Sequence, residues 1–439
     1  MNDNSAEIRQ NDFTHSPNYK WAVVTMLWFI CFFNYADRQA IFSIFPLLES
    51  KFGFSEKELG YIGAAFTWIY AAMAPIAGHT GDKFRRKYVI LIGLYVWSII
   101  TGFTALCSKV WHFVLVRGAE GLGETFYFPA SMSLISDYHS KTTRSRAMSI
   151  HQTSVYAGTI GGGALAGWMG QEYGWQSPFV LLGVLGVVLG LFLSKFIREP
   201  ERDEAERLEQ GRVEATAAEQ SVPVSVFIKD VLRTPTLLTL ILAFFGANSV
   251  GVIFLTWMPK FLYDKFSLTL AVAGLSATVF LQIASAIGSI VGGVLADKWR
   301  HRMAGGRILT QALGTFLGAP FIFLCGYTTD LKWLVLAMTC FGFSKGLYDA
   351  NIWASMYDVV APSRRATTLG IANMIGWFGG GLGALLIGLV VGDYKVTMSA
   401  AISSTAVIYV LIGVLLTVAA LFFAPRDVHR ATEPDVRPQ

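Results

Sequence analysis

Seven ionisable side chains lie inside otherwise apolar segments of the sequence. They are Asp37, Arg38, Arg117, Glu120, Glu124, Lys345 and Asp349. In a segment that crosses a membrane, a charge near the bilayer centre costs roughly 2.5–3.5 kcal/mol on insertion scales. Ion pairs that merely hold helices together are the alternative role, but buried pairs contribute little to stability. Carboxylates beside arginines therefore predict a site that handles protons and an anion.

The arginines and the carboxylates suit different tasks. A guanidinium binds a carboxylate through two N–H groups and keeps its charge, so Arg38 and Arg117 are predicted to bind the anion. Asp37 and Glu124 are predicted to carry protons, because the pKa of a carboxylate depends on its burial and its neighbours. Arg117 and Glu124 are seven residues apart and share nearly one helical face.

Ion pairing offers some of these groups another role. Glu120 lies between Arg117 and Glu124 and can pair with Arg117 within one helix. Lys345 and Asp349, four residues apart, can pair in the same way. These three residues, Glu120, Lys345 and Asp349, are therefore possible ion-pair partners rather than transport groups.

Polar and aromatic residues complete the predicted substrate site. The candidates are Tyr35, Gln282, Tyr348, Asn351, Asn373 and Trp377. Amide groups can bind the hydroxyls of a sugar-like molecule, and an indole ring can cover one of its faces. Core packing, or a place in the aromatic belt of a membrane protein, is the alternative for the tryptophan.

The composition shows which elements must position these groups. Of 439 residues, 53% are hydrophobic and 15% charged, whereas a soluble domain has roughly 25% charged residues. The apolar residues form long blocks, many of which exceed the roughly 18 residues that indicate a membrane span. We therefore predict an all-α polytopic membrane protein. No nucleotide-binding loop, metal cluster or nucleophile constellation appears, so we expect no enzyme, no metal and no cofactor.

Twelve apolar blocks are long enough to cross a membrane. They cover residues 21–45, 59–77, 88–106, 113–134, 147–169, 179–196, 237–262, 270–295, 308–326, 334–360, 369–391 and 400–423. We predict two six-helix bundles, 21–198 and 236–424, a linker at 199–235 with a short surface helix, and tails at 1–20 and 425–439.

Lysine and arginine are more frequent in the loops on one side of the predicted membrane. The positive-inside rule assigns that side, with both termini and the linker, to the cytoplasm. The net charge of +5 is thereby explained by orientation, so we expect no nucleic acid as a partner. We expect a monomer in the inner membrane of the cell.

The two halves of the sequence repeat each other. A Gly-x-x-x-Asp-Lys segment follows the second block at 78–83 and the eighth at 293–298, and Asp137 has a counterpart in Asp358. Glycine runs at 161–163 and 379–381 occupy the fifth and eleventh blocks. Duplication of a helical unit is typical of secondary transporters.

The repeated loop carries a family resemblance. Gly78-x-x-x-Asp82-Lys83-x-Arg85-Arg86-Lys87 resembles the loop signature of the major facilitator superfamily, with a second copy at 293–302. The resemblance implies the fold of that family, with twelve transmembrane helices in two pseudo-symmetric halves. It also implies a cytoplasmic gate, in which ion pairs hold the halves together in the outward-open state. We assign Asp82, Arg86, Arg146 and Asp297 to this gate.

A narrower resemblance lies at the charged residues. Asn34-Tyr35-x-Asp37-Arg38 and Arg117-x-x-x-Gly121-x-x-Glu124 look like motifs of the anion:cation symporter family, which includes sugar-acid, hexuronate and sialic-acid carriers. Spinster-type lipid transporters have similar patterns. The resemblance implies proton-coupled symport of a small organic anion, such as a hexonate or hexuronate, by alternating access. A Spinster-like transporter of lysolipid or sphingolipid and a membrane sensor without transport are the alternatives.

Overall fold

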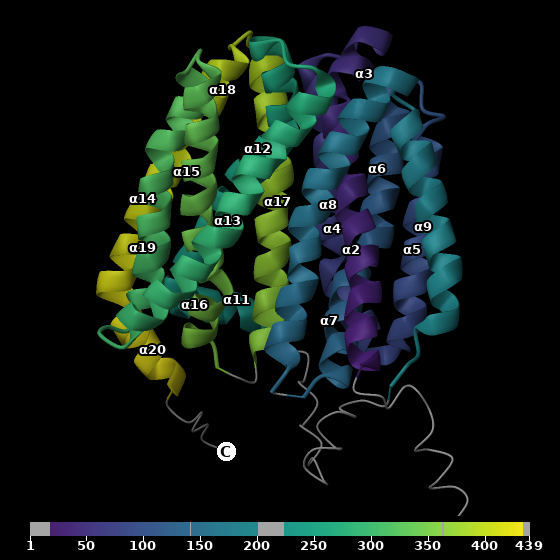
Figure 1. Cartoon of the computed structure of the whole chain (residues 1–439). Helices are drawn as coiled ribbons and strands as arrows, with labels where there is room; N and C mark the ends of the chain where they lie inside the picture. Colours follow the sequence, from purple (N-terminus) through teal and green to yellow (C-terminus); the bar gives the residue numbers. More distant parts are fainter. Residues whose placement is uncertain (1–17, 141, 201–223, 362–363, 433–439) are drawn as a thin grey trace, which may run out of the picture.

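The structure is a computed structural model that describes residues 18–140, 142–200, 224–361 and 364–432. Every regular element in these ranges is helical (Figure 1). The first half contains α2 (Tyr19–Ser43), α3 (Phe45–Phe52), α4 (Glu56–Lys83), α5 (Arg86–Thr104), α6 (Val110–Thr125), α7 (Tyr127–Tyr138), α8 (Arg144–Tyr173) and α9 (Ser177–Phe196). The second half contains α11 (Val224–Arg233), α12 (Pro235–Phe266), α13 (Leu270–Arg300), α14 (Gly306–Tyr327), α15 (Leu331–Asp349), α16 (Ile352–Val359), α17 (Arg365–Gly392), α18 (Met398–Ser404), α19 (Ala406–Val418), η3 (Ala419–Phe423) and α20 (Ala424–Thr432).

The described helices account for the twelve predicted crossings. Eight segments are long and apolar enough to span a membrane by composition alone. Two of the other crossings are the single helices α2 and α8. The remaining two each consist of a pair of helices, α6 followed by α7 and α15 followed by α16. All of these are less apolar because they contain the buried charges and many small or polar residues. Large apolar side chains such as Leu115, Leu191 and Ile290 are exposed on the outer surface. Such a surface suits lipid, and the predicted membrane fold is confirmed.

The fourth and tenth crossings are each broken, although the sequence predicted continuous helices there. In the first half, α6 ends at Thr125 and α7 contains Pro129 at its third position. Proline lacks an N–H group, and its ring clashes with the carbonyl four residues earlier, so the helix is interrupted. In the second half, the break lies between α15 and α16, and Asn351 occupies it. Its amide donates to the carbonyl oxygens of Leu347 in α15 (3.1 Å) and Gly292 in α13 (3.2 Å).

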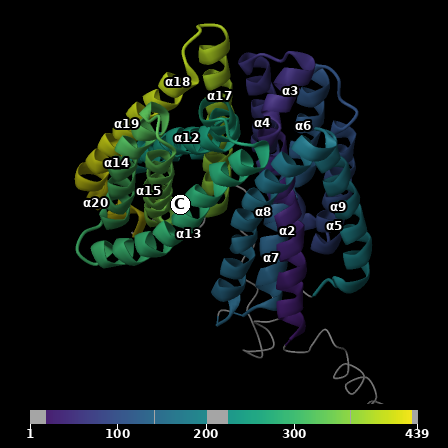
Figure 2. The ribbon, with the colours of Figure 1, turned by 45° about the horizontal axis from the view of Figure 1, so that its top comes forward.

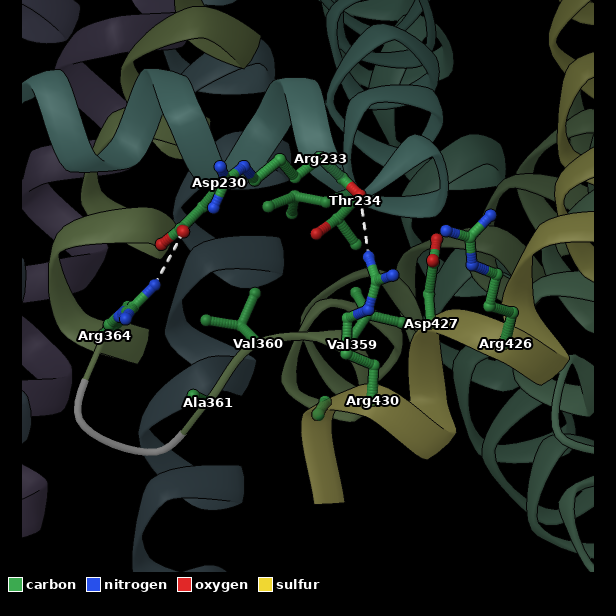
Figure 3. Close-up of a pocket in the computed structure, with 12 residues that line it drawn as sticks. Asp230, Arg233, Thr234, Val359, Val360, Ala361, Arg364, Arg426, Asp427 and Arg430 are labelled. Atoms are coloured by element: carbon green, nitrogen blue, oxygen red, sulfur yellow. Dashed lines mark hydrogen bonds and ion pairs between the residues drawn. The ribbon is translucent and has the colours of Figure 1, made fainter. Parts of the chain in front are cut away.

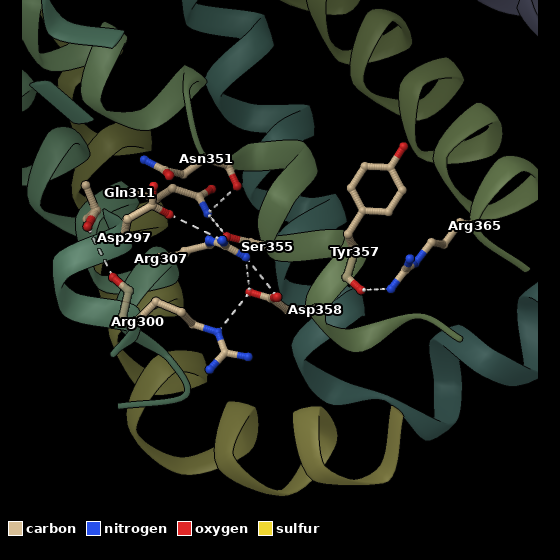
Figure 4. A network of polar contacts seen from close by, with 11 residues as sticks. Asp297, Arg300, Arg307, Gln311, Asn351, Ser355, Tyr357, Asp358 and Arg365 are labelled. Atoms are coloured by element: carbon tan, nitrogen blue, oxygen red, sulfur yellow. Dashed lines mark hydrogen bonds and ion pairs between the residues drawn. The ribbon is translucent and has the colours of Figure 1, made fainter. Parts of the chain in front are cut away.

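An ion pair repeats in the two halves. Arg86, at the start of α5, pairs with Asp137 near the end of α7. Arg307, in the first turn of α14, pairs with Asp358 in α16 through oxygens at 2.9 and 3.0 Å (Figure 4). In both pairs 51 residues separate the partners. The duplication that the sequence indicated therefore extends to a specific contact between equivalent helices.

The halves contact each other at one end of the molecule. We call the end where α2 begins and α20 lies the linker end, and the other the distal end (Figures 1 and 2). The contacts between halves are made mainly by α4 with α17 and α8 with α13. At the distal end, Lys57 pairs with Asp393 (2.8 Å) and Lys260 with Glu49 (2.6 Å).

Glycines make this contact close. A Cβ atom on Gly163 of α8 would lie 2.8 Å from the carbonyl oxygen of Gly274 in α13, and one on Gly60 would touch the backbone of Gly388. Small residues let helix backbones approach closely in membrane proteins. The structure is therefore closed at the distal end.

Two amphipathic helices flank the second half at the linker end. The short helix predicted within the linker is α11, and its Phe227 is buried in the second-half core. The sequence did not predict α20 beyond the last span. Its Asp427 is 3% exposed and accepts a hydrogen bond from the backbone N–H of Thr236 (3.0 Å), at the start of α12. The second half thus extends through residue 432.

Candidate functional site

The predicted charged residues of the first half form one buried cluster between α2 and α6. Nε of Arg38 lies 2.5 Å from Oε2 of Glu124, and Arg117 pairs with Glu120 one turn away on its own helix. Exposed fractions of these four residues and of Asp37 do not exceed 8%. The structure therefore brings together the five residues that the sequence selected, and it pairs Arg38 with Glu124 rather than Asp37.

Asp37 is the carboxylate of the cluster that has no arginine partner among the described residues. It accepts a hydrogen bond from Thr101 of α5 (3.4 Å), and it lies within electrostatic range of Glu120, Glu124 and Arg117. Thr104, one turn after Thr101, donates to Glu120 at 3.3 Å. Sequence reasoning missed both threonines, although two hydroxyls three residues apart in an apolar helix are a detectable signal.

Aromatic rings surround the two guanidinium groups. Cζ of Arg38 lies 4.5 Å from the ring centre of Tyr35, 4.6 Å from that of Tyr70 and 4.9 Å from that of Phe66. Arg117 lies 4.7 Å from the same Phe66 ring. Rings at this distance attract a cation while excluding water. Phe66 and Tyr70, on α4, were not predicted because an aromatic residue in an apolar helix gives no separate signal.

Several polar atoms of the cluster make no hydrogen bond within the described residues. Nη1 of Arg38, Nε and Nη2 of Arg117, Oδ1 of Asp37 and Oε1 of Glu124 are buried without a hydrogen-bond partner in the described part of the chain. Buried polar atoms in proteins are nearly always satisfied. Unused N–H donors beside unused carboxylate oxygens suit a site where an anion and protons exchange partners.

The charges of the cluster do not balance when all groups are ionised. Two arginines face three carboxylates, so one surplus negative charge is buried. One bound proton would neutralise the cluster. A bound anion that pairs with an arginine would displace a carboxylate, which would then need a proton of its own, because an unpaired buried charge is costly.

The second half contributes a different set of groups. Lys345 and Asp349 pair with each other on α15. Tyr156, which belongs to α8 in the first half, is close enough to interact electrostatically with both. Trp377 of α17 contacts Tyr70 at a ring distance of 5.3 Å. Tyr70 therefore links Arg38 to the second half, through a cation–π contact with Arg38 and an edge-to-face contact with Trp377.

Other predicted substrate residues lie in different surroundings. Tyr348 is 1% exposed and belongs to the hydrophobic core of the second half. The amide of Asn351 donates to carbonyl oxygens of α15 and α13 at the break between α15 and α16. Gln282 on α13 is buried and Asn373 on α17 is half-buried, and both helices face the first half.

The predicted gate residues form contacts within their own halves. Arg86 pairs with Asp137 and Glu199, Asp297 pairs with Arg307 (3.3 Å; Figure 4), and Arg146 lies over the ring of Trp21. The side chain of Asp82 lies outside the described residues. A gate between halves belongs to a state closed at the linker end, whereas this structure is closed distally, so the gate stays a prediction.

A duplicated helical bundle with ionisable groups buried near the contact between its halves is the architecture of a secondary transporter. The model of the Major Facilitator Superfamily matches residues 27–384 and 261–439. The chain belongs to the major facilitator superfamily, and it is a membrane transporter rather than an enzyme.

Relatives and solved structures agree with this assignment. The chain is 26% identical to the probable galactarate/D-glucarate transporter GudP of Escherichia coli over 94% of this chain and 95% of that protein. It is 25% identical to the hexuronate transporter of Bacillus subtilis over 87% and 90%. An inward-facing crystal structure of a bacterial Spinster homologue has a TM-score of 0.77 at 20% identity, covering 96% of this chain and all of that one. The fold is therefore that of the family. Sugar-acid carriers are found among the relatives, and a Spinster homologue is found among the similar structures, as the sequence motifs indicated.

Proposed function

We propose that this protein is a proton-coupled symporter of a small organic anion, with sugar acids as the substrate class. The observation that carries the proposal is the buried cluster in which three carboxylates face two arginines and Asp37 has no arginine partner. Relatives named as galactarate, glucarate and hexuronate transporters support the substrate class. We expect protons as the coupling ion and no other cofactor.

Competition for Arg38 gives the coupling a physical basis. Glu124 holds Nε of Arg38 at 2.5 Å, while Nη1 of the same guanidinium is unpartnered. A substrate carboxylate that binds Arg38 through the parallel N–H groups of Nε and Nη2 must displace Glu124 from Nε. Protonation of Glu124 removes its charge and so favours the exchange, and Asp37 is the second proton site. Arg117 is 1% exposed and paired with Glu120, so its contact with substrate requires that pair to open.

Alternating access would move the cluster from one side of the membrane to the other. With the linker end in the cytoplasm, as the positive-inside rule indicates, the distal contact of α4 with α17 and α8 with α13 closes the outer side. Opening that contact and forming the gate at the linker end would expose the cluster outward. The two halves of one chain already enclose a transport pathway, so we propose that the protein works as a monomer. We propose the inner membrane as its location.

The number of coupled protons sets how far the substrate accumulates. A pH difference of one unit supplies roughly 1.4 kcal/mol per proton, or about tenfold accumulation. One proton with a monovalent anion moves no net charge. A second proton, for which Asp37 and Glu124 together provide the sites, would add the membrane potential at about 2.3 kcal/mol per 100 mV.

Uptake by proteoliposomes tests the proposal. Purified protein would be reconstituted and given an inward proton gradient together with labelled galactarate, glucuronate or a lysolipid. Uptake of a sugar acid that collapses when the gradient is dissipated by a protonophore is the expected result. Lysolipid movement without sugar-acid uptake would reject it and favour the Spinster-like alternative.

A further inference from the structure

A cavity lies at the linker end of the second half, away from the charge cluster. It has a volume of about 640 Å³ and is lined by α11, the start of α12, the end of α16, the start of α17 and α20 (Figure 3). Ligand-binding cavities in proteins have volumes of about 300–1,000 Å³. The cavity is therefore large enough for a small molecule or a lipid headgroup.

Arginines dominate the lining of this cavity. Its charged residues are Arg233, Arg364, Arg426, Arg430, Asp230 and Asp427. Both carboxylates have structural partners, because Asp230 pairs with Arg364 at 2.6 Å and Asp427 caps α12. The lining has a surplus of positive charge, so the cavity attracts anions.

Three of the arginines remain available to a ligand. Within the described chain, the guanidinium groups of Arg233, Arg426 and Arg430 form no ion pair with a carboxylate. Nη1 of Arg430 donates to the backbone carbonyl of Arg233 at 3.4 Å, which holds α20 beside α11 (Figure 3). Guanidinium groups bind phosphate oxygens through paired N–H donors and stay charged at any physiological pH. All three line the same cavity, so together they give it a positive charge that suits a phosphate-bearing anion.

The surroundings of the cavity resemble a membrane interface. On α11, Ile228 is 52% exposed and Leu232 is 72% exposed, directly before Arg233. On the approach to α20, Phe422 of η3 is 71% exposed. Apolar side chains that face lipid beside a basic cavity are the arrangement in which proteins bind anionic headgroups.

We propose that this cavity binds a phosphate-bearing anion, and that Arg233, Arg426 and Arg430 are its ligands. The phosphate comes either from an anionic phospholipid headgroup or from a soluble phosphate compound. A bound phosphate would join α11 to α20, and so would hold the linker helix beside the final helix. The site does not depend on the proposed transport substrate.

Native mass spectrometry of the purified full chain tests this site. The probes are phosphatidylglycerol, phosphatidylcholine as the uncharged comparison, and inorganic pyrophosphate. The variant R233Q/R426Q/R430Q removes the three guanidiniums that form no ion pair within the described chain. The matched control R85Q/K298Q/R302Q removes the same charge from side chains that are exposed elsewhere on the linker end.

The expected result is a preference for phosphatidylglycerol over phosphatidylcholine that falls by about tenfold or more in the cavity variant and by less than about twofold in the control. Selective loss of pyrophosphate binding instead would assign the site to a soluble phosphate. Equal binding by the cavity variant and the wild type would overturn the proposal. If the triple variant does not fold, R426Q alone is compared with R302Q by the increase in melting temperature on adding each probe.

Discussion

Replacing Glu124 by Gln tests whether this carboxylate competes with the substrate for Arg38. Gln keeps the size of the side chain but removes the charge that holds Nε of Arg38. In the wild type, rising pH ionises Glu124 and strengthens its hold on Arg38, so affinity for the anion should fall. In E124Q the affinity should be higher at alkaline pH and nearly independent of pH.

The size of the effect follows from the contact that is removed. A hydrogen bond to a charged group contributes about 1.5–3 kcal/mol, so E124Q should bind the anion roughly 10- to 150-fold more tightly than the wild type at alkaline pH. At acidic pH, where Glu124 is protonated, the two proteins should converge. Because Glu124 is one of the two proposed proton sites, E124Q should lose the part of the accumulation that its proton supplies, about tenfold per pH unit.

Two assays separate these effects. Binding of labelled galactarate to the purified protein across a pH series gives the affinity, and proteoliposomes loaded with unlabelled galactarate give exchange and uphill uptake. E120Q is the matched control, since Glu120 is equally buried on the same helix but pairs with Arg117. The control should keep the pH dependence of binding. Accumulation by E124Q equal to that of the wild type, or an equal pH dependence of binding, would refute the reasoning.

Three further substitutions have expected outcomes. Arg38→Lys loses the paired N–H donors and should raise KM for the anion by about tenfold or more in an uptake assay; an unchanged KM would argue against contact with substrate. Gly163→Val places side-chain atoms against Gly274 and should prevent the distal end from closing. Uptake should then stop, and a cysteine introduced at the distal end should stay accessible to a thiol reagent. Normal uptake would contradict this. Asp427→Ala removes the cap of Thr236 and should lower the free energy of unfolding by about 0.5–2 kcal/mol, which a thermal melt of the detergent-solubilised protein measures; an unchanged melting temperature would exclude a capping role.

Much of the fold followed from the sequence because the signals are local. Blocks of apolar residues predicted the twelve crossings, since a lipid environment requires each helix to be apolar along its length. The repeated loop and Asp137 with Asp358 indicated the duplication. The breaks of the fourth and tenth crossings were missed, because Pro129 and Asn351 sit in segments whose apolar pattern continues past the break.

For the candidate site too, the sequence predicted one part and the tertiary structure decided the rest. The sequence by itself selected the charged residues, because an ionisable side chain in an apolar helix is costly and therefore conspicuous. Only the tertiary structure decided that Arg38 pairs with Glu124 across 86 positions of sequence, that Thr101 reaches Asp37, and that Tyr70 joins Arg38 to the second half. It also created the arginine cavity from helices at both ends of the second half. Pairing between distant residues depends on how whole helices pack, and the spacing of residues along one helix does not contain that information.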